Sequence, residues 1–244
     1  MPAIKPIIPT NLKLLWAEED AVMGWSMQMM ADPDRTYLLD HLELVETYMD
    51  CIGQLRQQSQ HGDYHWVFMG LFLRTFDAFG RCVRSALSGD YTTSAAMARD
   101  LLETQFLISY LQDDPERPEQ WLRATKKELK ETFSPWKIRV ELDKRDGFKE
   151  QKRKASYDLL SVAASHPTPM SFQMKADSNG KLGCGPQRNP DLLEGCLQEA
   201  ARQAMMLGAC LVLYAVEFPD GDKASSRLSL MLQKLRSVYF GSGE

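Results

Sequence analysis

The sequence is poor in the features that mark secreted, metal-binding and membrane-spanning proteins. Its five cysteines are scattered, and no two have the C-x-x-C spacing, so neither a disulfide framework nor a structural zinc site is expected. Charged residues interrupt every apolar run well short of the roughly 18 residues that a membrane span needs. The first nine residues hold three prolines and do not have the pattern of a signal peptide. These absences predict a cytoplasmic protein with reduced thiols and no membrane contact.

The motifs of common catalytic and cofactor sites are missing as well. The chain has no P-loop, no G-x-S-x-G nucleophile motif, no H-E-x-x-H and no paired E-x-x-H. We therefore predict no metal and no cofactor. Whether the chain is an enzyme stays open, because the site residues of a helical bundle come from separate helices.

The composition is that of an ordinary globular protein with a concealed basic segment. The 244 residues are 44% hydrophobic and 25% charged, with a net charge of −4, and nothing resembling a linker divides them. We predict one domain over residues 1–244, with an extended segment at 1–9. Between Arg123 and Lys154, however, 12 Lys or Arg stand against 6 Asp or Glu.

That basic segment has two interpretations. Aromatic residues interleave with lysines there, which could suit stacking on single-stranded RNA, with Lys126, Lys127, Lys130 and Lys137 as RNA-binding candidates. The interpretation favoured here is a solvated helix face whose aromatic side chains point inward.

Helical periodicity covers most of the chain. Apolar residues recur at helical spacing over residues 10–31, 34–58, 64–87, 92–111, 116–132, 136–165, 191–217 and 224–240. The prediction is an all-α fold, a single antiparallel bundle of about eight helices.

Residues 167–190 break this periodicity. Two short segments flank Asn179-Gly180, a strong hairpin signal. We predict a small β-hairpin near 171–185 within an irregular insertion, a kind of segment that is often functional or flexible.

Two charges stand out in the nearly apolar helix over Tyr91–Gln112. Arg99 and Glu103 are four residues apart on one narrow stripe. Charges in such a helix are costly unless partnered, so we predict that both side chains are at least two-thirds buried and paired. The pair either holds neighbouring helices in register, which is the favoured interpretation, or serves a site as a fixed guanidinium with a tunable carboxylate.

His166 is the best general acid or base candidate. It precedes Pro167, which pushes it out of the α region at the end of a helix, where an exposed imidazole is usable. A structural histidine is the alternative. Arg99, Glu103 and His166 together form the candidate catalytic set.

Segments around these residues resemble a known superfamily. They are Ala95–Thr104 (AAMARDLLET), Tyr110–Arg117 (YLQDDPER), Tyr157–Ser161 (YDLLS) and His166-Pro167. Over Tyr91–Pro167 they look like uncharacterised bacterial helical proteins, which more distantly resemble the HEPN superfamily of toxin–antitoxin and phage-defence bundles. Ribonucleases of that superfamily cut RNA without metal, using an Arg and a His separated by four to six residues. Arg56 and His61 match this spacing, although chance yields such a pair readily.

Three hypotheses of function follow. The first is a regulatory or interaction bundle in bacterial stress response or phage defence, with a protein partner or a second copy of the chain bound through residues 167–190 and the methionine-rich first helix. The second is a metal-independent ribonuclease using Arg99 and His166. The third is a small-molecule pocket between helices, lined by Trp66, Phe72, Phe76 and Tyr110.

Overall fold

The computed structural model describes residues 9–58, 61–148 and 151–240. Every regular element in these ranges is helical, which confirms the all-α class. The expected extended segment at 1–9 falls, apart from Pro9, outside the described residues.

The helices follow one another with short connections. In chain order they are α1 (Thr10–Met30), α2 (Tyr37–Arg56), α3 (Asp63–Leu87), α4 (Tyr91–Gln112), α5 (Arg117–Arg123), α6 (Lys126–Glu131), α7 (Pro135–Arg145), α8 (Lys152–Leu160), α9 (Pro169–Gln173), α10 (Pro190–Ala215) and α11 (Gly221–Phe240), with a 3₁₀ segment η1 (Pro33–Arg35) and a π-helical segment η2 (Ser161–Ser165).

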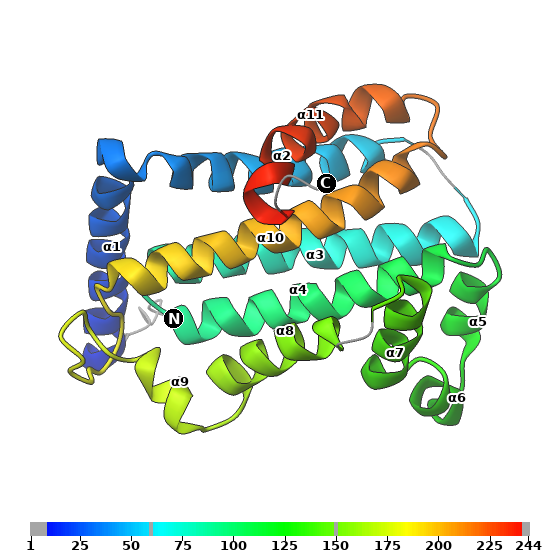
Figure 1. Ribbon diagram of the computed structural model, residues 1–244. Helices are drawn as coiled ribbons and strands as arrows, with labels where there is room; N and C mark the ends of the chain where they lie inside the picture. The colour runs from blue at the N-terminus through cyan, green and yellow to red at the C-terminus, as the bar shows by residue number, and fades with distance from the viewer. Residues whose placement is uncertain (1–8, 59–60, 149–150, 241–244) are drawn as a thin grey trace, which may run out of the picture.

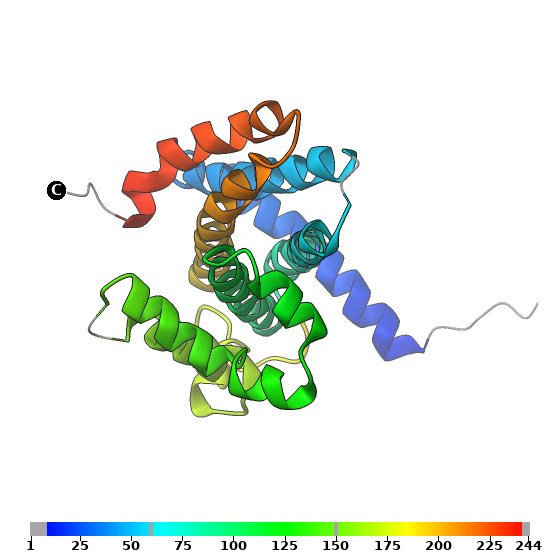
Figure 2. The same cartoon turned by 90° about the vertical axis from the view of Figure 1, so that its right-hand side faces the viewer.

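Four long helices form the body of the molecule. Helices α2, α3, α4 and α10 lie side by side, and α11 packs against α2 and α10 (Figure 1). Helices α7 and α8 cover the outer side of α4, whereas α1 runs across the ends of the long helices and projects from the bundle (Figure 2). Helix α4, which carries the candidate residues Arg99 and Glu103, contacts both α7 and α8.

The core is continuous through the long helices and is rich in aromatic rings. Tyr48, Phe68, Phe72 and Phe79 are fully buried. The hydroxyl of Tyr48 lies 2.6 Å from Thr75 Oγ1, so the polar atom of this core tyrosine is satisfied.

Small residues allow α10 and α11 to approach closely. A Cβ added at Gly208 would lie 3.0 Å from a methyl group of Leu232 on α11. The Ala- and Gly-rich face of α10 therefore sets the spacing of these two helices.

The described residues form eleven α-helices, so the prediction of about eight was wrong. The expected helix over 116–132 is divided because Thr125 starts α6: its hydroxyl accepts the N–H of Glu128, whose carboxylate accepts the N–H of Thr125. The expected helix over 136–165 is divided near Gly147, which has a φ of 68° and ends α7 as a left-handed C-terminal residue does.

The predicted β-hairpin near 171–185 is also wrong. Its first arm is instead the short helix α9, because Thr168 and Ser171 form a capping box and Pro169 occupies the first helical position. The reversal at Asn179-Gly180 is present, with Gly180 at a φ of 77°. The described residues around it form a single isolated bridge, between Ala176 and Leu182, and no strands.

The second half of the insertion is fixed to the start of α4. The hydroxyl of Tyr91 lies 3.0 Å from the carbonyl oxygen of Gln187 and accepts the N–H of Asn189 at 3.3 Å. Gly89, with a φ of 79°, accepts the N–H of Gln187, and a Cβ there would lie 2.6 Å from the Gln187 carbonyl oxygen. Only glycine fits this contact.

All five cysteines are free thiols, and only Cys184 is exposed. No helix within the described ranges combines the length and the apolar character that crossing a membrane demands.

Candidate functional site

Arg99 and Glu103 form an ion pair on α4, as predicted. Arg99 Nη2 lies 3.0 Å from Glu103 Oε1, and the two side chains are 23% and 32% exposed. Both are thus about two-thirds buried or more, which confirms the predicted burial and pairing. The pair is partly solvated, so its loss costs less than the loss of a pair in a dry core.

Tyr157 on α8 connects this pair to α7. Arg99 Nη2 donates a hydrogen bond to the Tyr157 hydroxyl, and the Arg99 guanidinium carbon lies 4.7 Å from the centre of the ring. The guanidinium carbon of Arg139, on α7, lies 3.9 Å from the same ring centre. One aromatic ring therefore contacts two cations, each attracted by the negative π-face.

Helix α7 is oriented by its apolar residues. Ile138 and Leu142 are buried in the core, and this places their neighbours Arg139 and Asp143 on the side that faces α8. Arg139 and Asp143 are four residues apart and could pair with each other. They do not, because Asp143 is bound by Arg153 of α8 at 2.7 Å.

A network of ion pairs closes this end of the site. Arg153 also binds Asp146, which is bound in addition by Arg145. The hydrogen bond from Arg145 lowers the pKa of Asp146, and the same contact raises the pKa of Arg145. Both groups are therefore charged at neutral pH, and the carboxylates of Asp143 and Asp146 are already occupied by arginines.

Arg139 does not take part in these ion pairs. The residue is only 8% exposed, and its Nη1 atom is buried with no hydrogen-bond partner among the described residues. Within the same ranges it has no ion pair, and its contact is the face of Tyr157. A buried charge without a counter-ion is costly, so Arg139 is the residue of this region that most needs an anion.

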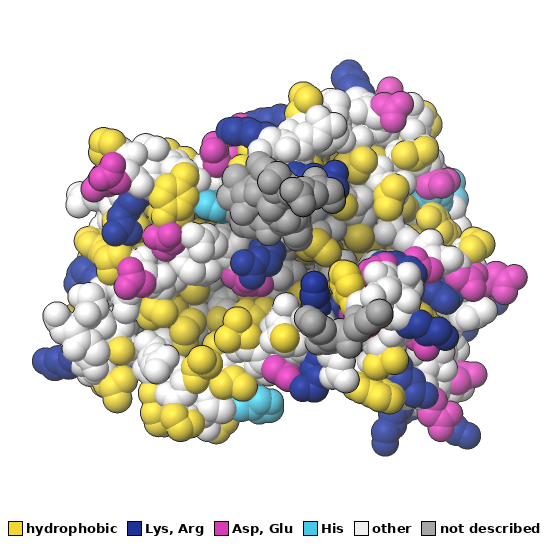
Figure 3. Space-filling view, viewed as in Figure 1, with side chains coloured by type: hydrophobic (Ala, Val, Ile, Leu, Met, Phe, Trp, Pro, Cys, Tyr) yellow, Lys and Arg dark blue, Asp and Glu magenta, His cyan; other side chains and the backbone are white. Residues whose placement is uncertain are grey.

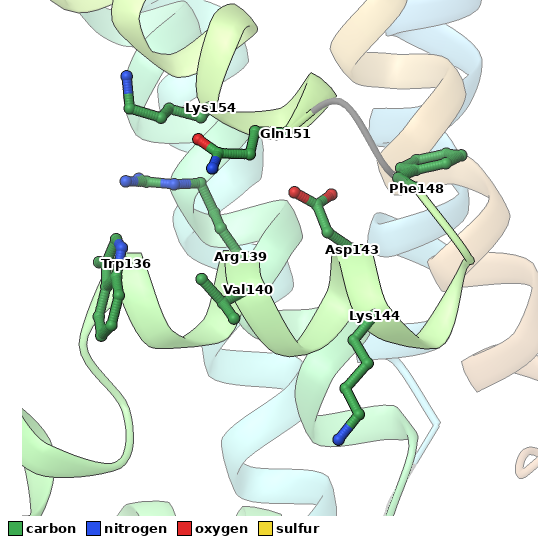
Figure 4. Close-up of a pocket in the computed structure, with 8 residues that line it drawn as sticks. All are labelled: Trp136, Arg139, Val140, Asp143, Lys144, Phe148, Gln151 and Lys154. Carbon is green, nitrogen blue, oxygen red and sulfur yellow. The ribbon is translucent and has the colours of Figure 1, made fainter.

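A cavity of about 320 Å³ opens beside Arg139 (Figure 4). It is lined by residues of α7, of α8 and of the connection between them: Trp136, Arg139, Val140, Asp143, Lys144, Phe148, Gln151 and Lys154. In Figure 4 the guanidinium of Arg139 lies between the side chains of Trp136 and Lys154. With Asp143 already neutralised by Arg153, the wall of the cavity is positively charged.

Backbone strain is found at the same place. Gln151, at the start of α8, has a φ of 48° and is the only non-glycine residue of the described ranges with a positive φ. This left-handed conformation is unfavourable for a residue with a Cβ, and such residues cluster at functional sites.

His166 is not joined to this cluster. It has the extended backbone expected before proline, with φ −126° and ψ 142°, and its side chain is exposed. No described residue forms a hydrogen bond or ion pair with it. The π-helical segment η2 immediately before it lies against α4, and such segments often occur at functional sites.

The four candidate RNA-binding lysines are exposed. Lys126, Lys127 and Lys130 lie on α6 and Lys137 lies on α7. Figure 3 shows basic side chains gathered at the edge of the molecule over α6 and α7, mixed with acidic ones. RNA binding by these residues stays a prediction.

Arg56 and His61 line a separate cleft of about 470 Å³, together with His65, Trp66 and Tyr214. His65 is held there by its Nδ1 atom, 3.2 Å from the Tyr214 hydroxyl. Of the four side chains expected to line one pocket, only Trp66 lines this cleft. Phe72 and Tyr110 are buried in the core, and Phe76 packs against it.

Sequence reasoning missed the two residues that complete the cluster, Arg139 and Tyr157. The spacing Trp136, Arg139, Asp143 places three side chains on one helix face and could have drawn attention to Arg139. The basic segment was instead interpreted as a whole, and its aromatic residues were expected to point inward. Phe133 does so, but Trp136 is 60% exposed.

Within the described ranges, no group of three or more His, Cys, Asp or Glu side chains is placed to hold a metal ion. No family model, curated protein or solved structure matches this chain. What the protein does is therefore inferred from the chemistry of the Arg139 cavity.

Proposed function

We propose that this chain is a non-catalytic regulatory bundle that binds a phosphate-bearing anion in the cavity beside Arg139. The resemblance to toxin–antitoxin and phage-defence bundles supports a bacterial stress or defence setting. In that setting the occupied cavity would govern the binding of a protein partner, with the insertion 167–190 as the partner-binding segment.

One observation carries the proposal: the unpaired guanidinium of Arg139 borders an open cavity. The residue is 8% exposed and has no ion pair among the described residues, and the cavity volume of about 320 Å³ is within the range of small-molecule sites. Guanidinium groups bind phosphate through two parallel hydrogen bonds. An anion in this cavity would supply the negative charge that Arg139 lacks.

Calorimetric titration with pyrophosphate tests this function. Wild-type protein should bind pyrophosphate, and Arg139→Met should weaken the affinity roughly tenfold or more, because it removes charge-assisted hydrogen bonds. The matched control is Arg123→Met on α5, whose exposed arginine pairs with Asp63 and Glu119. Equal loss of affinity in both variants would mean that pyrophosphate responds only to net charge, and the proposal would fail.

A second candidate function is a metal-independent ribonuclease. The observation that favours it is the cleft that Arg56, His61 and His65 line together, since two imidazoles and a guanidinium suit proton transfer at a phosphodiester. The other candidate pair, Arg99 and His166, receives less support because Arg99 is occupied by Glu103 and Tyr157.

Incubation of single-stranded RNA with a chelator separates the two functions. A non-catalytic bundle leaves the RNA intact. Cleavage that is lost in His61→Ala would establish the ribonuclease at the Arg56 cleft, and cleavage lost in His166→Ala would place it at Arg99 instead.

A further inference from the structure

Aromatic side chains as well as cations line the cavity beside Arg139. Two large aromatic side chains line it and remain open to solvent, Trp136 at 60% and Phe148 at 41% exposure. Phe133, from the same basic segment, is buried in the core. Figure 4 places Trp136 and Phe148 at opposite ends of the cavity, and Lys152 and Arg153 contact the ring of Phe148. Trp136 is therefore the aromatic surface of the cavity that is open to a ligand.

The positions of these groups define the shape of a ligand. Trp136 and Arg139 lie one turn apart on the same face of α7, and Figure 4 shows the indole beside the guanidinium. An indole provides a flat apolar surface on which a planar ring can stack. A guanidinium one helical turn away binds a phosphate group. The ligand that uses both has a planar ring and a phosphate close together.

The charges around the cavity agree with this shape. Lys154 lines it on the side of Arg139 and is paired with Asp158, whereas Lys144 lines it with its side chain directed away from Arg139 (Figure 4). Asp143, the one carboxylate among the described residues of the wall, is bound by Arg153 at 2.7 Å. A phosphate would therefore meet the unpaired guanidinium of Arg139 and, among the described residues of the wall, no free carboxylate.

From this arrangement we propose that the ligand is a phosphate monoester that carries a planar ring, with the ring stacked on Trp136 and the phosphate bound by Arg139. This inference rests on the proposed anion-binding function and names its ligand class. A free nucleotide and the 5′-phosphorylated end of an RNA strand share this chemistry. A strand would continue from Trp136 toward Lys137 and the α6 lysines.

A matched pair of probes isolates the ring: AMP and ribose 5-phosphate differ only by the base. Calorimetry should show that wild-type protein binds AMP about tenfold more tightly, since stacking of one base on an aromatic side chain contributes roughly 5- to 150-fold. Trp136→Ala should reduce this ratio to about one and leave the affinity for ribose 5-phosphate within twofold. Trp16→Ala, which removes an exposed tryptophan of α1, should leave the ratio unchanged.

Equal affinity of the wild type for the two probes would overturn the ring assignment, while binding of both that is lost in Arg139→Met would still uphold the anion site. If neither probe nor pyrophosphate binds, the proposed function falls together with this inference.

A 5′-phosphorylated tetraadenylate distinguishes the two sources of the ligand. Tighter binding than AMP, weakened by Lys137→Ala, identifies the strand end, and affinity equal to that of AMP identifies the free nucleotide.

Discussion

The guanidinium carbon of Arg139 lies 3.9 Å from the centre of the Tyr157 ring. A carboxylate at this position would neutralise the arginine, whereas the π-face of tyrosine only attracts it. Arg139 is thus held in place while its charge stays available. Because Arg99 binds the hydroxyl of the same tyrosine, Tyr157 also joins α8 to α4.

The stability of an Arg139→Met variant should show that Arg139 contributes little to the folded state. Removing an unpaired buried guanidinium takes away little that stabilises the fold, so we expect the free energy of unfolding without ligand to stay within about 1 kcal/mol of the wild type or to rise. Urea denaturation measures it. Leu142→Ala on the same helix should by contrast cost about 2–5 kcal/mol, because Leu142 is fully buried. A comparable loss in both variants would mean that Arg139 is a structural residue.

Glu103→Ala should destabilise the protein more than the loss of an exposed ion pair would. The substitution leaves Arg99 without its carboxylate, but a third of the Glu103 side chain is solvated, so we expect a cost of about 1–2 kcal/mol. Glu119→Ala breaks the exposed pair with Arg123 and should cost under about 0.5 kcal/mol. Thermal unfolding compares the two, and an unchanged midpoint in Glu103→Ala would show that the pair does not hold the helices together.

Glu199 on α10 should make stability depend on pH. Burial raises the pKa of this carboxyl above its ordinary value of 4.5, so the folded state holds the proton more tightly than the unfolded state. Unfolding then releases a proton, and this contribution to stability falls as the pH rises from about 4.5 toward the folded pKa.

Glu199→Gln removes that titration and should flatten the decline of unfolding free energy in this window. Glu119→Gln, which changes an exposed carboxylate of α5, should leave the decline as in the wild type. Parallel stability curves for the wild type and Glu199→Gln would refute the assignment.

Within the insertion 167–190, trypsin should cut first after Lys181. Lys181 is exposed at the reversal of the chain, whereas Lys175 pairs with Asp90 and Arg188 pairs with Glu18. Peptide mass mapping at early times identifies the cut, and Lys181→Gln should abolish it. Protection of Lys181 in the wild type would indicate that a partner or a second copy covers the turn.

The helices that the sequence predicted well are those whose apolar residues repeat without interruption. Helices α3, α4 and α10 begin and end within a few residues of the expected positions, because their buried faces are long enough to decide the period. The breaks at Thr125 and Gly147 depend on local capping and left-handed backbone, which compete with periodicity over single residues. The expected hairpin arm became α9 for the same reason.

The candidate site was predictable only in part. The cost of isolated charge in an apolar helix was enough to predict the Arg99–Glu103 pair. Arg139 could not be identified in this way, because α7 has a polar sequence in which an arginine is ordinary. Arg139 lacks a counter-ion because Arg153 of α8 binds the carboxylate of Asp143 in the folded protein. The spacing of residues along α7 does not reveal this contact between helices.

The most direct test of the anion site is to locate a bound anion. Crystals soaked in tungstate, a dianion with the tetrahedral shape of phosphate, should give an anomalous peak for the tungsten atom about 4 Å from the Arg139 guanidinium nitrogens, because the tungstate oxygens accept hydrogen bonds of about 3 Å. Crystals of Arg139→Met should lack this peak. Tungstate bound elsewhere on the molecule, with the cavity between α7 and α8 empty in the wild type, would contradict the account.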